Sequence, residues 1–470
     1  MNFVEPSFAP FFLVTLSVYW ALRDRRRQNL WLVGASAVFY GAAHWWFVAL
    51  LAGASMVDFA VAQAMTRYPG NKRLLLALSL CSNLGLLGTF KYADFFLENV
   101  TAGFAAWGLP FESRSLGWIL PIGISFYTFQ TIGYVVDVYR GEIKARTNVV
   151  DYLLFVSFFP QLVAGPIGRA SKLLPMVENP RTFAWSALRS GVTLACWGGF
   201  KKVVIADSIA PYVDKTYMLV EPAGPLLWVA TAGFMLQIFA DFSGYTDIAR
   251  GVARCFGFEL AENFREPFLA ATTPEFWQRW HMSLSTWIRD YLLGPLVGNG
   301  AVSRWRFAAA TLTAFVVIGF WHGPRWNFIL FGAWQGVWVV AYGLLTRRIP
   351  PVLANLPGAR ALAVSFHLGF VSLIGTMLFR EVTVARILGN LSRSPFSATG
   401  AEWVATEVLG AVVVAGTTPL LLGWAVKVYV RPRFADATWW PIETTGWALA
   451  IVAMFVFFRV TAQDFVYFQF

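Results

Sequence analysis

One of the four histidines in this chain, His322, occupies a position where an imidazole can act as a base. It ends an almost uninterrupted apolar run over 315–321 and is followed by Gly323 and Pro324, which predict a break in the helix. A break beside an imidazole frees backbone groups and makes room for a substrate. An ionisable residue in an apolar segment is a functional hypothesis by default, and neutral histidine is a usable base near pH 7. His322 is therefore the first catalytic candidate.

His281 is the second candidate. It lies in an aromatic and partly charged stretch over 276–291, where helical spacing places it on one face with Trp277 and Ser285. A lone histidine is commonly a hydrogen-bonded structural residue. A scaffold role therefore remains an alternative for His281 and, with less force, for His322.

The other histidines and the cysteines predict no further site. His44 precedes two tryptophans, which indicates an anchor at a membrane interface, and His367 lies in a plain apolar run, which indicates a structural residue. Cys81, Cys196 and Cys255 are far apart and lack metal or redox spacing. The serine-hydrolase elbow, the His-Glu-x-x-His zinc motif and the phosphate-binding loop are absent as well. We therefore expect no metal and no bound cofactor.

The composition predicts that membrane helices position the two candidate histidines. The chain has 470 residues, of which 57% are hydrophobic and only 13% are charged, whereas soluble domains carry about 25% charged residues. Such a chain has too few polar residues to cover a soluble protein of this length. The 22 tryptophans suit the interface between lipid and water, where one part of the ring is wet and the rest is apolar.

Apolar runs that approach the length of a membrane span, about 20 residues, recur along the whole chain. A first run covers 8–22, and a shorter one over 151–166 ends in Ala-Gly-Pro and predicts a broken or re-entrant helix. We predict an all-α polytopic membrane protein with about 11 to 13 transmembrane or re-entrant helices and a single membrane-embedded domain over 1–470. The remaining candidates lie near 30–43, 45–65, 74–92, 117–138, 187–206, 223–240, 305–321, 326–345, 359–379, 406–428 and 442–459.

The charges predict an orientation rather than a nucleic-acid partner. The net charge is +11, but the basic residues form short clusters between apolar runs, as at 23–27, 67–73 and 140–146, and no single patch. This is the pattern of cytoplasmic loops. The first apolar run precedes its arginines, the reverse of a secretory signal. We expect a multi-pass protein of the bacterial inner membrane with its N-terminus outside.

Residues 241–300 interrupt the apolar pattern with many charges and four tryptophan or histidine side chains. Unpaired charges are costly in lipid, so this region must lie at an interface or line a polar cavity. A cytoplasmic loop with amphipathic helices is one interpretation, and the vestibule of a site is the other.

Within and around this region, several strings closely resemble the membrane-bound O-acyltransferase family. They are DFSGYTD at 241–247, ENF at 262–264, FWQRWHMSLSTWIRDY at 276–291 and FWHG at 320–323. Upstream, LPIGISFY at 120–127 and FPQLVAGPI at 159–167 resemble the bacterial branch that contains alginate O-acetyltransferases. The resemblance extends over nearly the whole chain.

The resemblance implies a catalytic role for His322 and an important, less clearly chemical role for His281. It implies tilted helices that ring a central tunnel, an acyl thioester that enters from the cytoplasm, and an acceptor that arrives from the other side. The thioester would be acetyl-CoA or an acyl-carrier protein. Acyl transfer to a hydroxyl needs a base and donors for the oxyanion. Candidate residues for donor binding or for the tunnel wall are Arg279, Trp280, Ser285, Trp287, Arg289, Asp290 and Trp321. For the arginines, ordinary cytoplasmic charge or pairing with Asp290 is the alternative.

The C-terminal sequence 464–470, DFVYFQF, is aromatic and resembles the ends of bacterial members that work with a periplasmic partner. By this resemblance Tyr467 is a candidate acyl relay, and an interfacial aromatic anchor is the alternative. We expect an O-acyltransferase, most simply an acetyltransferase, that modifies an exported or cell-surface polysaccharide with a periplasmic or extracellular acyltransferase partner. The alternatives are transfer of D-alanyl or another acyl group and, from another class, a transporter or flippase. The hydropathy shows no inverted repeat, which argues against a transporter.

Overall fold

A computed structural model describes residues 1–109, 115–298, 302–345 and 358–459. These ranges consist of helices and their connections and contain no strand, so the prediction of an all-α protein is confirmed. The first part of the chain forms α1 (Phe8–Ala21), α2 (Arg25–Gly41), α3 (Trp45–Arg67), α4 (Lys72–Leu87), α5 (Ala93–Ala106), α6 (Ile124–Arg140), α7 (Val149–Ser157), α8 (Phe159–Leu162) and α9 (Ala170–Glu178).

The rest of the described chain continues the helical pattern. Its helices are α10 (Trp185–Phe200), α11 (Asp207–Met218), α12 (Gly224–Cys255), α13 (Thr273–Trp277), α14 (Met282–Ile288), α15 (Gly294–Val297), α16 (Arg304–His322), α17 (Trp326–Leu345), α19 (Ala359–Phe366), α20 (Leu373–Arg380), α21 (Val384–Leu391), α22 (Gly400–Ala425) and α23 (Asp436–Phe457). Wider π-helical turns join several of them, namely η2 (Gly88–Tyr92), η3 (Lys201–Ala206), η5 (Arg289–Leu293), η6 (His367–Ser372) and η7 (Val426–Val430). Short 3₁₀ turns are η1 (Pro69–Asn71), η4 (Pro267–Leu269) and η8 (Arg431–Arg433).

Seven helical stretches in the described ranges are long and apolar enough to cross a membrane, which establishes a polytopic membrane protein. They cover Trp45–Arg67, Pro69–Ala106, Gly224–Cys255, Trp326–Leu345, Ala359–Arg380, Gly400–Arg433 and Trp439–Phe457. Other predicted segments form helices that are shorter or carry more charge, such as α2, α6, α10 and α16. The predicted break near 151–166 is real, because α7 ends at Ser157 and the short α8 follows it, with most of both buried inside the protein.

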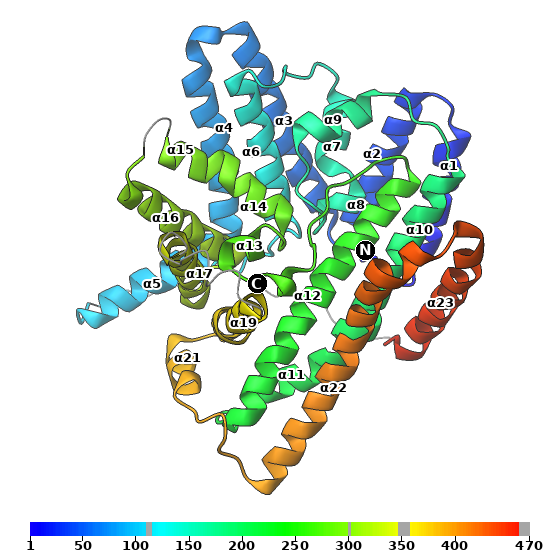
Figure 1. Ribbon diagram of the computed structural model, residues 1–470. Helices are drawn as coiled ribbons and strands as arrows, with labels where there is room; N and C mark the ends of the chain where they lie inside the picture. The colour runs from blue at the N-terminus through cyan, green and yellow to red at the C-terminus, as the bar shows by residue number, and fades with distance from the viewer. Residues whose placement is uncertain (110–114, 299–301, 346–357, 460–470) are drawn as a thin grey trace.

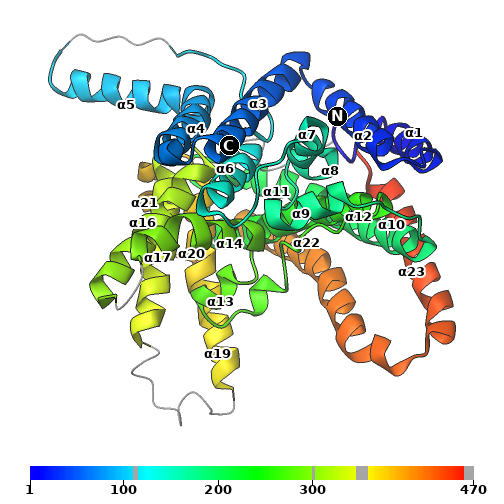
Figure 2. The ribbon, with the colours of Figure 1, turned by 90° about the horizontal axis from the view of Figure 1, so that it is seen from above.

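The long α12 runs through the middle of the molecule, and the other helices gather around it (Figure 1). In the view from above, α1–α4 lie on one side and α16, α17, α19 and α20 on another, while α5, α19 and α23 reach the periphery (Figure 2). Of the residues of α12 in its most apolar window, 72% are buried, against 0% for Trp439–Phe457. The core therefore sits between α12 and the helices that surround it.

Small residues let the central helices approach closely. A Cβ added to Gly198 of α10 would lie 2.4 Å from the carbonyl oxygen of Gly244 on α12, and one added to Gly251 would lie 2.4 Å from that of Gly191. In membranes, helix association depends on such close backbone packing. A similar glycine contact joins α16 to α17, where a Cβ on Gly319 would lie 2.1 Å from the carbonyl oxygen of Phe328. This contact fixes the end of α16, which carries His322.

The basic clusters meet at one end of the molecule, called here the basic end and defined by Arg25, Arg140 and Arg146. Arg25 pairs with Asp151 at 3.0 Å, and Arg146 forms an ion pair with Glu178. Near the end of α3, the side chain of Gln63 donates to the carbonyl of Arg146. Arg25 and Arg146 are thus both tied to the segment that holds α7 and α9, and the orientation of the chain in the membrane stays a prediction.

A second group of charges lies inside the helix bundle, at the junction of α10, η3 and α12. Lys201 pairs with Asp247 at 2.7 Å, and Lys202 pairs with both Asp207 and Asp241 at 2.8 Å. The side chains of Lys202 and Asp241 are only 2% and 1% exposed. These five residues are called the lysine–aspartate network below.

Candidate active site

His322 is the last residue of α16, and the helix ends there because the next two residues cannot continue it. Gly323 is fully extended, and Pro324 has no backbone N–H to donate. The imidazole is 4% exposed and lies among rings, with centroid distances of 5.1 Å to Trp321, 5.2 Å to Phe379 and 6.0 Å to Phe331. The predicted helix break beside His322 is thus present.

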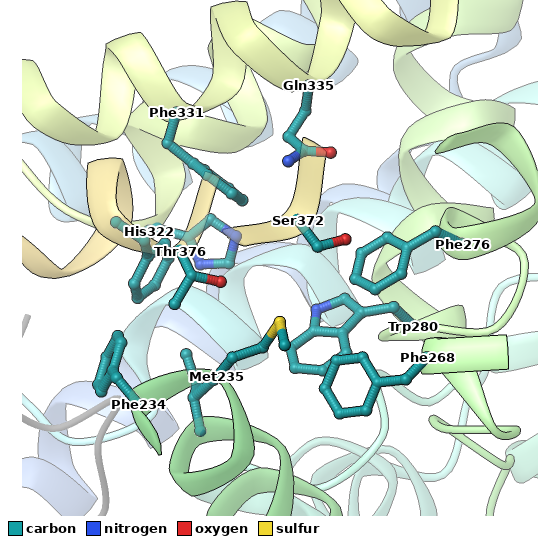
Figure 3. A pocket seen from close by; sticks show the side chains of 12 residues that line it. Phe234, Met235, Phe268, Phe276, Trp280, His322, Phe331, Gln335, Ser372 and Thr376 are labelled. Carbon is teal, nitrogen blue, oxygen red and sulfur yellow. The ribbon is translucent and has the colours of Figure 1, made fainter. Parts of the chain in front are cut away.

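The imidazole of His322 faces a pocket of about 510 Å³, its open mouth included, between α12, α17 and the segment η6–α20. Figure 3 shows His322 beside Thr376, with Ser372 and Trp280 across the same space. Most of the wall is aromatic or aliphatic, and the described lining residues include no carboxylate. They are Phe234, Met235, Ile238, Phe268, Phe276, Trp280, His322, Phe331, Gln335, Ser372, Thr376 and Phe379.

His281 is fully buried at the start of α14, where its backbone adopts a left-handed conformation with φ of 42°. Such a conformation is uncommon outside glycine and needs support from its surroundings. Asn263 supplies it, because its carbonyl accepts from the Met282 N–H at 2.9 Å and its side-chain oxygen accepts from the Ser283 N–H at 3.1 Å. The string ENF thus positions His281.

Both histidines lie beside the ring of Trp321. The ring of Trp321 is 5.1 Å from that of His322 and 6.1 Å from that of His281. Within the described part of the chain, neither ring nitrogen of His281 nor the ring N–H of Trp321 has a hydrogen-bond partner, although all are buried. Buried polar groups are normally satisfied, so these atoms mark a place for water or substrate. Of the rings of His281, Trp321 and His322, only that of His322 lines the pocket.

An aromatic column supports Trp321 from the side of α6 and α14. Phe129 stacks on Trp321 with centroids 5.4 Å apart, and Trp287 stacks on Phe129 at 4.0 Å. The Trp287 N–H donates to the Phe129 carbonyl at 2.8 Å. Stacked rings of this kind add rigidity to the area that they bury. Because its N–H is used in this way, Trp287 supports the site from behind.

The remaining predicted site residues occupy several places. Trp280 lines the pocket, whereas the hydroxyl of Ser285 donates to the Trp280 carbonyl at 3.2 Å. Arg279 pairs with Glu275 at 2.9 Å, and Arg289, whose side chain is 66% exposed, pairs with Asp290 at 2.7 Å. Tyr467 lies outside the described residues.

Asp290 also joins the predicted stretch to the basic end. Its carboxylate pairs with Arg169 at 2.7 Å, and its carbonyl accepts from Arg140 at 3.1 Å. Partial burial opposes ionisation of the carboxyl group, but the hydrogen bond from Arg289 and the charges of both arginines beside it lower the pKa of Asp290 below its usual range. Asp290 is therefore an anion that pairs with both Arg169 and Arg289.

Sequence reasoning missed the polar groups that α17 and η6–α20 bring to the pocket, Gln335, Ser372 and Thr376. They lie in apolar runs without any motif, and only the packing of α20 against α12 and α17 reveals them. His367, interpreted as structural, stands behind the pocket, with its Nδ1 3.5 Å from the Ser372 hydroxyl. No group of three potential metal ligands occurs among the described residues.

Comparison with known proteins gives consistent results. A family model described as MBOAT, membrane-bound O-acyltransferase family, matches residues 140–380. A probable alginate O-acetylase of Azotobacter vinelandii is 39% identical over 340 residues, which cover 71% of this chain and 66% of that protein. A peptidoglycan O-acetyltransferase of Helicobacter pylori is 36% identical over 364 residues, with 70% and 68% covered. A teichoic acid D-alanyltransferase of Bacillus subtilis is 30% identical over 243 residues, with 48% and 60% covered. The chain thus spans about two thirds of the two O-acetyl-transferring relatives.

Proposed function

The chain belongs to the membrane-bound O-acyltransferase family, and we propose that it transfers acetyl groups from a cytoplasmic thioester to an exported or cell-surface polysaccharide. As a member of that family it is an O-acyltransferase. One observation carries the assignment of the site: the imidazole of His322 faces an aromatic pocket at the point where α16 ends. We do not propose a transporter, because transport would not account for the acyl-transfer activity of the family.

In the proposed reaction, His322 acts as the general base. The imidazole takes the proton of the acceptor hydroxyl while the hydroxyl oxygen attacks the thioester carbonyl. The resulting oxyanion needs nearby hydrogen-bond donors, and Ser372, Thr376 and Trp280 carry such groups on the pocket wall. When the intermediate collapses, the carbon–sulfur bond breaks, the thiolate recovers the proton from the imidazolium, and an ester remains.

The wall of the pocket favours an uncharged acyl group. A D-alanyl group carries an ammonium ion, and burying an ammonium ion without a counter-charge is costly. The described lining residues offer rings, hydroxyls, an amide and an imidazole but no carboxylate. Acetyl therefore fits this wall better than D-alanyl, although relatives that transfer each of these groups are similar to this chain.

The names of the relatives support a polysaccharide acceptor. Alginate and peptidoglycan are the acceptors named for two O-acetyl-transferring relatives. On this basis the acceptor is an exported or cell-surface polysaccharide, reached from outside the inner membrane. Tyr467 is proposed as the acyl relay toward a periplasmic or extracellular acyltransferase partner. Replacing Tyr467 by Phe keeps the ring and removes the hydroxyl, so a relay would lose acceptor transfer but keep donor turnover or donor binding. Wild-type transfer by Tyr467→Phe would instead identify the tail as an anchor.

The donor is proposed to enter at the basic end, with that end in the cytoplasm and the N-terminus outside. Cysteine labelling on intact cells tests this orientation. Arg26 is the suitable position, because it is exposed, whereas Arg25 is tied to Asp151. An Arg26→Cys variant that reacts with an impermeant reagent from outside would overturn the orientation.

The central test is donor turnover by the purified protein. With acetyl-CoA carrying a labelled acetyl group, the wild type should release free CoA and transfer label, either to its own C-terminal peptide as the relay or to a soluble polysaccharide acceptor. A D-alanyl carrier-protein thioester should be used far more slowly. If acetyl-CoA is not consumed and an acetylated carrier protein is, the donor proposal changes. If neither thioester is consumed, the proposed reaction is wrong.

A further inference from the structure

The last turn of α16 needs hydrogen-bond donors that the helix cannot supply. The final carbonyl groups of any α-helix lack N–H partners in their own helix. Here the chain turns away at Gly323, and the following Pro324 has no N–H. The carbonyls of Phe320, Trp321 and His322 are therefore open at the turn from which the proposed base extends.

Two consecutive residues of the π-helix η2 supply these donors. Lys91 Nζ donates to the Trp321 oxygen at 2.7 Å and to the His322 oxygen at 3.1 Å. The Tyr92 hydroxyl donates to the Phe320 oxygen at 3.2 Å, and its ring stacks on that of Phe320 at 4.4 Å. Single π-turns inside α-helices are rare and frequently occur at functional sites. Here one such turn aims two side chains at the end of α16.

Lys91 is a costly residue at this place. It lies within a stretch, Pro69–Ala106, that is long and apolar enough to cross the membrane, and charges inside such stretches usually mark function. Lys91 has no ion pair among the described residues. Its ammonium group instead contacts the two carbonyls and lies 5.8 Å from the centre of the Trp321 ring. The negative end of the α16 dipole stabilises a cation there.

We propose that Lys91 is a positioning residue for His322: its ammonium group fixes the last turn of α16 and thereby the placement of the imidazole in the pocket. The inference rests on the proposed role of His322 as the base. A base has to be held close to its productive geometry, and a displacement of about 1 Å can cost about 10²-fold in rate. Lys91 acts on this geometry through the backbone and does not line the pocket itself.

The chain offers a matched control for this proposal. Lys91→Met keeps the length of the side chain and removes the ammonium group, whereas Lys91→Arg keeps a cationic donor. Tyr92→Phe removes a hydrogen bond from the same turn of α16 but leaves the carbonyls of Trp321 and His322 paired with Lys91. If Lys91 only stabilised the fold by closing the helix end, the Met and Phe variants would behave alike.

The first readout is steady-state turnover of acetyl-CoA by the full-length purified protein. Lys91→Met should lower kcat by about 10- to 100-fold with little change in KM, because the donor site is intact and only the base is displaced. Lys91→Arg should recover most of the rate, and Tyr92→Phe should stay near the wild type. Thermal unfolding of each variant shows which changes reflect the fold alone.

The second readout needs no donor. The chain has four histidines, so protein labelled with ¹³C and ¹⁵N in histidine gives few imidazole signals, and His322→Gln identifies one of them. Lys91→Met should shift the His322 signal and leave that of His44 in place, and Tyr92→Phe should shift it less. An unmoved His322 signal, or equal kcat losses in the Met and Phe variants, would overturn the proposal. If the wild type does not use acetyl-CoA, the donor proposal fails, and the His322 signal alone decides the role of Lys91.

Discussion

Two buried polar regions of this molecule differ in the neighbours of their polar side chains. In the lysine–aspartate network, Lys201 and Lys202 lie within 2.7 to 2.8 Å of aspartate oxygens. Around His322 and His281 the neighbours are mostly rings, and both ring nitrogens of His281 lack a partner within the described chain. In the network the polar side chains pair with one another, whereas the two histidines pack mainly against aromatic rings.

This difference distinguishes a structural role for the network from a catalytic role for the residues around His322. A buried charge that faces its counter-charge has little left to offer a substrate, and breaking such a pair leaves an uncompensated charge. An imidazole on the wall of a pocket, as that of His322 is, can reach a substrate hydroxyl and take its proton. We therefore expect mutations in the network to act on folding and mutations at His322 to act on the reaction.

The largest effect is expected at His322. His322→Gln should lower acyl transfer by about 10²- to 10⁴-fold, the usual contribution of a general base, with expression and thermal unfolding near those of the wild type. His44→Gln is the matched control, because His44 is exposed at the start of α3. Full activity in a well-folded His322→Gln protein would remove the distinction between the two regions.

The next effect should appear in the network and should be one of stability. Lys202→Met leaves Asp207 and Asp241 without their shared cation, and breaking a buried pair costs about 3–5 kcal/mol. We expect low yields of folded protein and a clearly lower Tm in detergent. Lys172→Met, at an exposed lysine, should match the wild type. A Lys202→Met protein with a normal Tm and no activity would place the network in the reaction instead.

His281 sharpens the comparison, because its backbone and its ring can be tested separately. Alanine at φ of 42° is strained by about 1–2 kcal/mol, whereas asparagine tolerates this conformation better. Both His281→Ala and His281→Asn should reduce transfer, and His281→Ala should also lower the Tm more than His281→Asn does. Equal losses of Tm and activity in both variants would make His281 a scaffold residue.

The smallest expected effect concerns the helix contact beside the network. Gly198→Ala should push α10 away from α12, since its Cβ would lie 2.4 Å from the Gly244 oxygen, and overpacking of this kind costs about 1–3 kcal/mol. We expect a modest drop in Tm with kcat unchanged in the folded fraction. Gly53→Ala on α3, where a Cβ meets nothing within 4 Å, is the control. A larger effect at Gly53 would contradict the close packing of α10 and α12.

The sequence by itself determined the helical membrane class, the break beside His322 and the broken segment near 151–166. These features depend on local properties: apolar runs of sufficient length, and glycine and proline, which stop a helix wherever they occur. The family resemblance added the importance of His281 and His322. The polar stretch 241–300 was also visible, but its sequence did not distinguish a loop from a vestibule.

Only the tertiary structure decided which of these residues meet. Lys91 is 231 positions from His322 and Asn263 is 20 positions from Ser283, yet each pair is joined by a hydrogen bond. The network likewise joins η3 to α12, and the pocket joins α12, α17 and α20. The period and hydropathy of one helix specify which face is apolar, but they do not specify which other helix covers that face. That choice follows from close packing between distant segments, such as the glycine contacts of α10 with α12 and of α16 with α17.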